Sequence, residues 1–280
     1  MTVCIVGLGL MGGSFALGLR ESGFASSLIG VESSPTHAEK ALALGLVDKI
    51  LPLEAALAQS QLVLLATPVD HLVQLAPRVL DLIRPDQVVF DAGSTKHPVV
   101  QSIKNHPLRK QFVATHPMAG TEFSGPGAAQ SGLFQGKCVV LCDTAQNSSE
   151  ACALVTAAYQ ALGMRMILME SNAHDLHVAY VSHISHIASF SLALTVLEKE
   201  KEEQRIFDLA GGGFSSTVRL AKSNPATWTP IFEQNSQHVL EVLDAFIANT
   251  IQFRNMLENK DLQGLYALME QANAIKRILP

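Results

Sequence analysis

The chain has 280 residues, of which 48% are hydrophobic and 16% are charged, and its formal net charge is −5. Because it carries no strong positive charge, nucleic acid and anionic membrane surfaces are poor partners for it. We expect a cytoplasmic protein with reduced thiols, since the four cysteines form no CxxC pair, the N-terminus lacks a basic start, and no segment reaches the roughly 18 uninterrupted apolar residues of a membrane helix.

Short apolar, β-branched runs alternate with helical patterns through the first half of the chain. The runs predict strands over 2–7, 27–32, 62–67, 87–93, 112–116, 137–142 and 164–169. Amphipathic segments such as 69–83 lie between most of them. Near-continuous apolar strands separated by helices are typical of parallel sheets covered on both faces. Residues 1–170 are therefore expected to form a doubly wound, Rossmann-like α/β domain.

The second half contains no convincing strand. Helical patterns cover 171–203, a short segment after the glycines at 211–213, then 225–259 and 261–279. Ser171 or Asn172 is the expected cap of the first long helix. Because the long helices carry more apolar surface than a small helical domain can bury alone, we expect residues 171–280 to form an all-helical domain that joins a homodimer.

The glycine-rich stretch GLGLMGGS at 7–14 follows the first strand and opens a helix. It places Gly7, Gly9 and Gly12 in GxGxxG spacing, which in this context predicts a dinucleotide loop. Glu32 follows Gly12 by twenty residues and can accept hydrogen bonds from ribose hydroxyls. No arginine or lysine in 33–37 can neutralise a 2′-phosphate, so NAD is preferred over NADP. The expected cofactor-binding residues are Gly7, Leu8, Gly9, Leu10, Met11, Gly12, Glu32, Thr67, Pro68 and Ser94.

Polar residues follow three neighbouring strands where a bound nicotinamide would lie. Thr67 and Pro68 end LLATP, Ser94 lies in FDAGSTK, and His116 lies in FVATHP. A neutral histidine here can accept a hydroxyl proton while the cofactor takes hydride from the same carbon. We expect His116 to be catalytic and Ser94 to orient it. The alternative is a loop histidine with a structural role only.

A second polar cluster lies in VSHISHIASF on the first long helix. Ser182, Ser185, His186 and Ser189 fall within an arc of about 100°, with His183 to one side. The stripe indicates either a polar cavity or a helix–helix contact. No metal is expected, because the four histidines at 174, 177, 183 and 186 point in different directions on one helix. Arg219 follows the glycine break and suits a carboxylate clamp, although a solvated surface arginine is the alternative.

Together these motifs resemble the prephenate/arogenate dehydrogenase family of tyrosine biosynthesis. The resemblance spans nearly the whole chain and is carried by GLGLMGGS, DAGSTK, THPMAGTEFSG, VSHISHIASFSLA and GGGFSSTVRLAKSNPATW. It implies NAD-dependent oxidation of the prephenate ring hydroxyl with loss of CO₂ to give 4-hydroxyphenylpyruvate, or of arogenate to give tyrosine. It also implies a homodimer joined through the helical domain.

The same resemblance implies roles for individual residues. His116 would accept the hydroxyl's hydrogen bond with Ser94 as its partner, and Arg219 would hold a substrate carboxylate. The other implied substrate-binding residues are Glu122, Ser182, His183 and His186. Ser215 stands where many relatives have an arginine, so the sequence does not decide between prephenate and arogenate. The sequence is likewise silent on inhibition by tyrosine, and we expect a monofunctional enzyme.

Two rival functions fit parts of the pattern. A β-hydroxyacid dehydrogenase or imine reductase shares the layout but typically uses a lysine on the first long helix, and here that helix has no lysine before Lys199. A non-enzymatic NAD sensor is the second rival, and it predicts that His116 is dispensable for any turnover.

Overall fold

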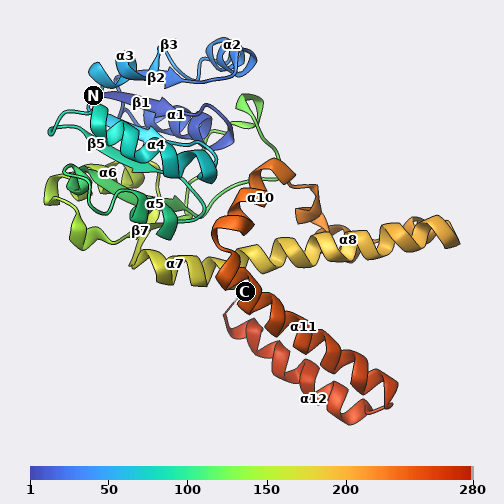
Figure 1. Cartoon of the computed structure of the whole chain (residues 1–280). Helices are drawn as coiled ribbons and strands as arrows, with labels where there is room; N and C mark the ends of the chain where they lie inside the picture. The colour runs from blue at the N-terminus through green and yellow to red at the C-terminus, as the bar shows by residue number, and fades with distance from the viewer. Residues whose placement is uncertain (279–280) are drawn as a thin grey trace. The chain divides into compact units, whose positions relative to one another are not determined.

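The structure, a computed structural model, describes residues 1–278. The chain forms two compact units that divide between Asn235 and Ser236. The first unit is built around one sheet (Figure 1). Its eight strands follow the order β3-β2-β1-β4-β5-β6-β7-β8. The strands are β1 Thr2–Val6, β2 Ser27–Val31, β3 Lys49–Ile50, β4 Leu62–Leu65, β5 Val88–Asp91, β6 Phe112–Pro117, β7 Cys138–Cys142 and β8 Arg165–Met169.

Every predicted strand is present, and the two-residue β3 is the one that the sequence patterns did not predict. The pairing is parallel except between β6 and β7, where His116 lies opposite Val140 in antiparallel register. This departs from the expected parallel sheet because the connection at 118–137 contains only the short 3₁₀ turn η2, Pro126–Ala128, and no crossover helix. A parallel neighbour requires such a crossover.

Helices cover both faces of the sheet, as a doubly wound domain requires. They are α1 Leu10–Glu21, α2 Pro35–Ala43, α3 Leu53–Ala58, α4 Val69–Leu82, α5 His97–Ser102 and α6 Ser149–Ala161. Alternate strand residues point to opposite layers. Val3 and Ile5 pack with α1 and α6 on one side, while Cys4 and Val6 pack with α3 and α4 on the other. Two separate hydrophobic cores result. The carboxyl ends of β1 to β6 meet at one edge of the sheet, and β7 and β8 run in the opposite direction.

The predicted long helix over 171–203 is present, with an interruption. It consists of α7 Ser171–Val178, a π-helical turn η4 Ala179–His183, and α8 Ile184–Glu203. Neither Ser171 nor Asn172 is its cap, because the helix starts after Glu170. Asp143 instead accepts a hydrogen bond from the Ser171 backbone N–H at 3.0 Å, so the cap comes from the loop after β7.

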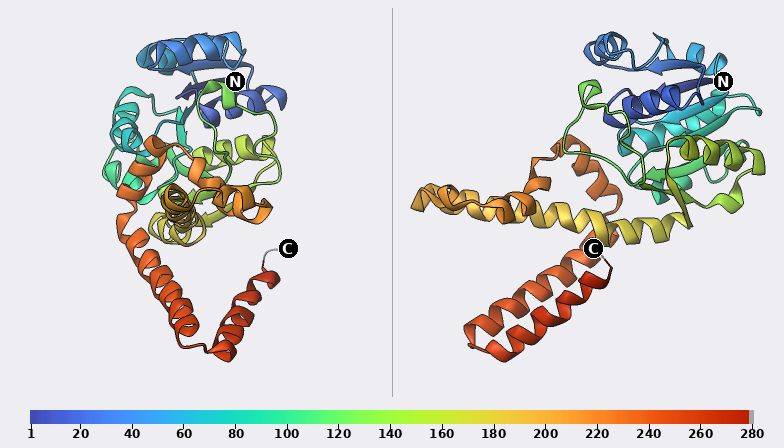
Figure 2. Two further views of the ribbon diagram at one scale, coloured as in Figure 1. Left: turned by 90° about the vertical axis from the view of Figure 1, so that its right-hand side faces the viewer. Right: turned by 180° about the vertical axis from the view of Figure 1, so that it is seen from behind.

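By length and hydropathy the helix over Ser171–Glu203 could cross a membrane. Its polar residues argue against that location. His174, Asp175 and His183 are each at most 2% exposed, and all three form hydrogen bonds inside the first unit. These buried hydrogen-bonded groups make α7 and η4 part of the core of the first unit, while α8 continues beyond the sheet (Figure 2).

The remainder is helical, as predicted. It comprises η5 Ile206–Leu209, α9 Gly212–Thr217, η6 Arg219–Lys222, α10 Pro225–Gln234, α11 Ser236–Glu258, α12 Leu262–Ala272 and η7 Asn273–Arg277. The predicted helix over 225–259 is divided in two at Asn235, whose side-chain Nδ2 donates to the Asp175 carbonyl at 2.7 Å. In the second unit α11 and α12 lie side by side and antiparallel (Figure 1). Residue 279, the end of the last predicted helix, lies outside the described residues.

Candidate active site

The glycine loop has the close backbone contacts that its spacing predicted. Gly7 has φ +92°, and a Cβ there would lie 2.6 Å from the carbonyl oxygen of Ala66. A Cβ on Gly12 would lie 1.9 Å from the carbonyl oxygen of Gly7. Both distances are far below van der Waals contact, so the fold itself requires these two glycines. A Cβ on Gly9 would instead meet nothing within 4 Å, which leaves space beside the start of α1 for a ligand.

Glu32 lies at the end of β2 and is bound to this loop. Its Oε2 accepts from the Leu8 backbone N–H at 2.9 Å, and its Oε1 accepts from the Ser34 N–H at 3.0 Å. The carboxylate is thereby held beside the glycine loop, where an acidic group can meet ribose hydroxyls. Leu10 and Met11 form the first turn of α1, whose N-terminus favours a pyrophosphate.

Thr67 and Pro68 connect β4 to α4 next to Gly7. The Thr67 hydroxyl is buried and has no hydrogen-bond partner among the described residues. An unpaired buried hydroxyl is costly, and here it is next to the loop that would hold a dinucleotide. The orphaned hydroxyl, the space at Gly9 and the carboxylate of Glu32 all fit NAD.

The DAGSTK loop after β5 contains a buried ion pair. Lys96 and Asp91 are both fully buried, and their charged groups are in direct contact. The Lys96 ammonium also donates to the Thr115 carbonyl at 2.9 Å, and Asp91 Oδ1 accepts from the Thr115 N–H at 3.0 Å. These bonds tie the loop after β5 to β6, one residue before His116. Breaking one partner of such a pair leaves an uncompensated buried charge.

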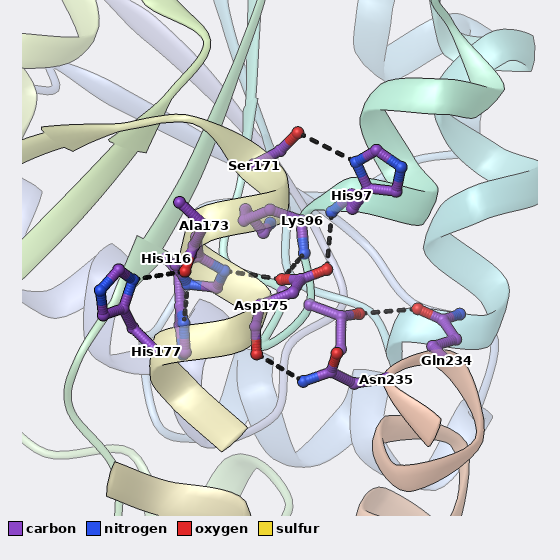
Figure 3. Close-up of polar contacts among 12 residues, drawn as sticks. Lys96, His97, His116, Ser171, Ala173, Asp175, His177, Gln234 and Asn235 are labelled. Atoms are coloured by element: carbon purple, nitrogen blue, oxygen red, sulfur yellow. Dashed lines mark hydrogen bonds and ion pairs between the residues drawn. The ribbon is translucent and has the colours of Figure 1, made fainter. Parts of the chain in front are cut away.

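His116 is 9% exposed and hydrogen-bonded to a second histidine. Its Nδ1 lies 2.8 Å from Nε2 of His174, and Nδ1 of His174 lies 2.7 Å from Oδ1 of Asp175. Asp175 also accepts from the backbone N–H groups of Lys96 and His97, each at 2.8 Å (Figure 3). The catalytic candidate on β6 is therefore linked through α7 to the loop that begins α5.

This chain of contacts corrects the expected partner of His116. Among the described residues no hydrogen bond joins Ser94 to His116, and Nδ1 of His116 is bonded to His174 instead. Ser94 is half-buried in the loop between β5 and α5. Its expected role toward the cofactor or substrate stays a prediction. Sequence reasoning missed His174 and Asp175, although the adjacent His–Asp pair at the start of a long helix was visible.

Burial holds the pKa of His116 well below its ordinary value of 6.5, and the nearby charges of His174, Lys96 and His183 act in the same direction. Burial also lowers the pKa of His174 despite its bond to Asp175. Both imidazoles are therefore neutral near pH 7. A neutral imidazole has one donor and one acceptor nitrogen, which is the state that a general base needs.

The polar residues on the long helix are only partly arranged as the helical projection predicted. The helical projection placed His183 to one side of the polar stripe, but the π-helical turn brings its side chain inward, where it is 1% exposed. Ser182 and Ser185 are only half-buried. Asn235 Nδ2 lies 3.1 Å from Nδ1 of His183. Burial is the main cause that lowers the His183 pKa to about 4. Nδ1 therefore accepts from Asn235, and Nε2–H is left as a donor.

His186 is 9% exposed and stacks on Trp228, with ring centroids 3.4 Å apart and planes at 27°. Its Nδ1 lies 3.0 Å from the Ser182 carbonyl oxygen, which indicates that Nδ1 carries the proton and that Nε2 is the acceptor nitrogen. Burial lowers the pKa of His186, and the charge of Arg219 contributes. Trp228 therefore supports the ring of a candidate substrate-binding histidine.

Arg219 and Glu122 contact each other. Nη1 of Arg219 lies 3.4 Å from Oε2 of Glu122, and the side chains are 54% and 23% exposed. The pair joins η6 to the loop after β6, so two residues predicted at the substrate site from distant parts of the sequence come together. Ser215 lies in α9 and is exposed. Within residues 1–278 no three His, Cys, Asp or Glu side chains form a metal-binding group.

Comparisons with known proteins agree along the whole chain. Residues 15–168 match the family model of the prephenate dehydrogenase nucleotide-binding domain, and residues 170–271 match that of the prephenate dehydrogenase dimerization domain. The prephenate dehydrogenase of Bacillus subtilis is 30% identical over 282 residues, covering 100% of this chain and 76% of the relative.

Two solved structures are also similar. Prephenate dehydrogenase from A. aeolicus in complex with hydroxyphenyl propionate and NAD⁺ has a TM-score of 0.90 and 32% identity, covering 99% of this chain and 97% of that one. Synechocystis arogenate dehydrogenase has a TM-score of 0.78 and 28% identity, with both chains fully covered. With the glycine loop and the buried His116, these matches establish an NAD-dependent dehydrogenase: the chain belongs to the prephenate dehydrogenase family.

Proposed function

We propose that the chain oxidises prephenate to 4-hydroxyphenylpyruvate and CO₂, with NAD as the cofactor and His116 as the proton acceptor. One observation carries the proposal most directly. His116 is buried, neutral and bonded through Nδ1, while its Nε2 makes no hydrogen bond within residues 1–278. A fixed imidazole with one free acceptor nitrogen suits a substrate hydroxyl.

Each group of site residues would have a separate role in this reaction. The glycine loop, Glu32 and Thr67 would hold NAD, which accepts a hydride from the ring carbon when it is bound. His116 Nε2 takes the hydroxyl proton as the carbon–oxygen bond becomes a carbonyl. The ring carboxylate is then vinylogous to a ketone, and its loss as CO₂ restores aromaticity. The protein's contribution is therefore orientation and proton acceptance rather than stabilisation of a difficult decarboxylation.

Substrate carboxylates would be held by donors on the helical segments η4 and η6. The Arg219 guanidinium can bind one carboxylate, and His183 presents Nε2–H because its Nδ1 accepts from Asn235. Ser182, His186 and Ser94 are the remaining polar candidates. Glu122 favours a second substrate, arogenate, because a carboxylate beside Arg219 can meet the ammonium group that prephenate lacks. The likeness to an arogenate dehydrogenase structure supports keeping this alternative.

We also propose a homodimer in the cytoplasm, with cofactor binding in residues 1–170 and dimerisation in residues 171–280. Large apolar side chains are exposed on α8 and in the second unit. Leu194 and Leu197 on α8 are 65% and 50% exposed, and Phe246, Ile247, Ile251 and Tyr266 are 41–66% exposed. Such surface is unusual in a monomer. Sedimentation as a stable monomer at low micromolar concentration would count against the dimer.

The test of the proposed function is a panel of four reactions. Purified protein is mixed with prephenate or arogenate and with NAD or NADP, and reduced cofactor is followed by absorbance. We expect turnover with prephenate and NAD. Arogenate as the better substrate would move the assignment to the alternative, faster turnover with NADP would refute the role of Glu32, and no turnover in any reaction would refute the proposal.

A further inference from the structure

Three buried side chains form a continuous line from α7 to β6. His116, His174 and Asp175 are 9%, 0% and 2% exposed, and their successive hydrogen bonds measure 2.8 and 2.7 Å. The His116 and His174 rings lie at 71° to each other, with centroids 5.0 Å apart, so the contact is an edge-on hydrogen bond rather than a stack. Buried polar chains of this kind have few alternative arrangements.

The direction of each hydrogen bond follows from the acceptor at the end of the line. Asp175 Oδ1 and Oδ2 each accept one backbone N–H at 2.8 Å, from Lys96 and His97. A carboxylate only accepts, so His174 Nδ1 must donate to it. Because His174 is neutral, its Nε2 carries no proton and must accept from His116 Nδ1–H. The lone pair of His116 is therefore on Nε2.

We propose that His174 and Asp175 are positioning residues that hold His116 in the Nδ1–H tautomer, so that its Nε2 can accept the substrate hydroxyl proton. The inference rests on the proposed function for the role of His116, but the tautomer itself is a property of the free protein. During the reaction the substrate O–H bond breaks and an Nε2–H bond forms on His116. The Nδ1–H remains bonded to His174, so no proton has to move beyond His116.

Two substitutions of His174 separate this role from packing. In His174→Gln the amide oxygen can accept from His116 Nδ1–H while the amide nitrogen donates to Asp175, which reproduces both bonds without a titratable group. In His174→Leu neither bond can form. A site that needed only packing would tolerate leucine better than a buried glutamine, so the two explanations predict opposite rankings.

The expected result is that His174→Gln keeps kcat within several-fold of wild type, whereas His174→Leu loses about 100-fold or more, the range for a lost general base. NAD affinity should be unchanged in both. Ser171→Ala is the matched control, because Ser171 lies on the same helix and contacts His97 at 3.4 Å outside the line. Equal activity of the glutamine and leucine variants, or a faster leucine variant, would overturn the inference.

A second measurement does not depend on turnover. Nitrogen NMR of histidine-labelled protein distinguishes the protonated from the unprotonated ring nitrogen of His116 without substrate. We expect Nδ1–H in wild type, in His174→Gln and in Ser171→Ala, and a mixture of tautomers in His174→Leu. An Nε2–H tautomer in the wild type would overturn the inference, even if prephenate oxidation is confirmed. The expected tautomer with no oxidation would sustain the inference and defeat the proposed function instead.

Discussion

Replacing His183 by asparagine should remove a measurable part of the acid sensitivity of this fold. His183 is 1% exposed, and burial lowers its pKa from 6.5 to about 4, opposed by Asp175 and assisted by His174 and His186. A histidine whose folded pKa is depressed contributes stability that is present above the unfolded pKa. That stability is lost as the pH falls from 6.5 toward 4, because the unfolded chain takes up the proton first.

The size of the effect follows from these two pKa values. Between about pH 7.5 and about pH 5 the proton uptake of the unfolded state costs about 2 kcal/mol of folding free energy from this one group. In His183→Asn the side-chain oxygen can still accept from Asn235, but it cannot titrate. The free energy of unfolding should therefore depend on pH less steeply in the variant, by about 2 kcal/mol over that range.

The assay is equilibrium unfolding in denaturant at both pH values and at one fixed protein concentration, since oligomerisation also affects stability. Comparing the variant with wild type cancels the contributions of other titrating groups. His71→Asn is the control, because the His71 side chain is 73% exposed, and it should keep the wild-type pH dependence. If the free energy of unfolding depended on pH equally in His183→Asn and in wild type, the claim that His183 is buried and neutral would be refuted.

Three further predictions concern the cofactor loop, the buried ion pair and the base. Gly12→Ala should lose the folded state or most of its stability, because the new Cβ would lie 1.9 Å from the Gly7 carbonyl oxygen. Gly9→Ala should have the melting temperature of wild type but bind NAD more weakly, as measured by calorimetry. Equal melting temperatures of the two variants would contradict this prediction. Lys96→Met leaves Asp91 buried without its partner and should cost about 3–5 kcal/mol in denaturant unfolding, and a cost below about 1 kcal/mol would show that the pair is unimportant. Because burial depresses the pKa of His116, kcat/KM should stay level as the pH falls through 6.5 and decline only below it. A pH–rate profile in which kcat/KM has already fallen to half its maximum at pH 6.5 or above would contradict a neutral buried base.

Much of the fold was predictable from local patterns. The strands are near-continuous apolar runs, so their positions could be read to within a residue or two, and the GxGxxG spacing predicted a loop whose glycines the backbone requires at Gly7 and Gly12. The antiparallel β6–β7 pair was not predicted. Its cause is that the connection between β6 and β7 contains no crossover helix. The sequence of that connection shows neither a helical nor a strand periodicity from which this could be predicted.

The site was predicted residue by residue but not as a network. His116 could be identified as the catalytic candidate because a histidine at the end of a buried strand seldom serves packing alone. Its partner was not, since the bond to His174 joins residues 58 positions apart and depends on how α7 packs against β6. The π-helical turn likewise shifts His183 relative to a regular helix, so a projection at constant angle placed it outside the polar stripe.

The most direct test of the account is a His116→Asn variant studied beside wild type with prephenate and NAD. Asparagine keeps a polar side chain of similar reach but supplies no basic nitrogen. We predict that the variant binds NAD with unchanged affinity and loses about 100-fold to 10,000-fold in kcat, the range for removing a general base. Turnover at the wild-type rate in a variant that still binds NAD would contradict the central claim that His116 accepts the substrate proton.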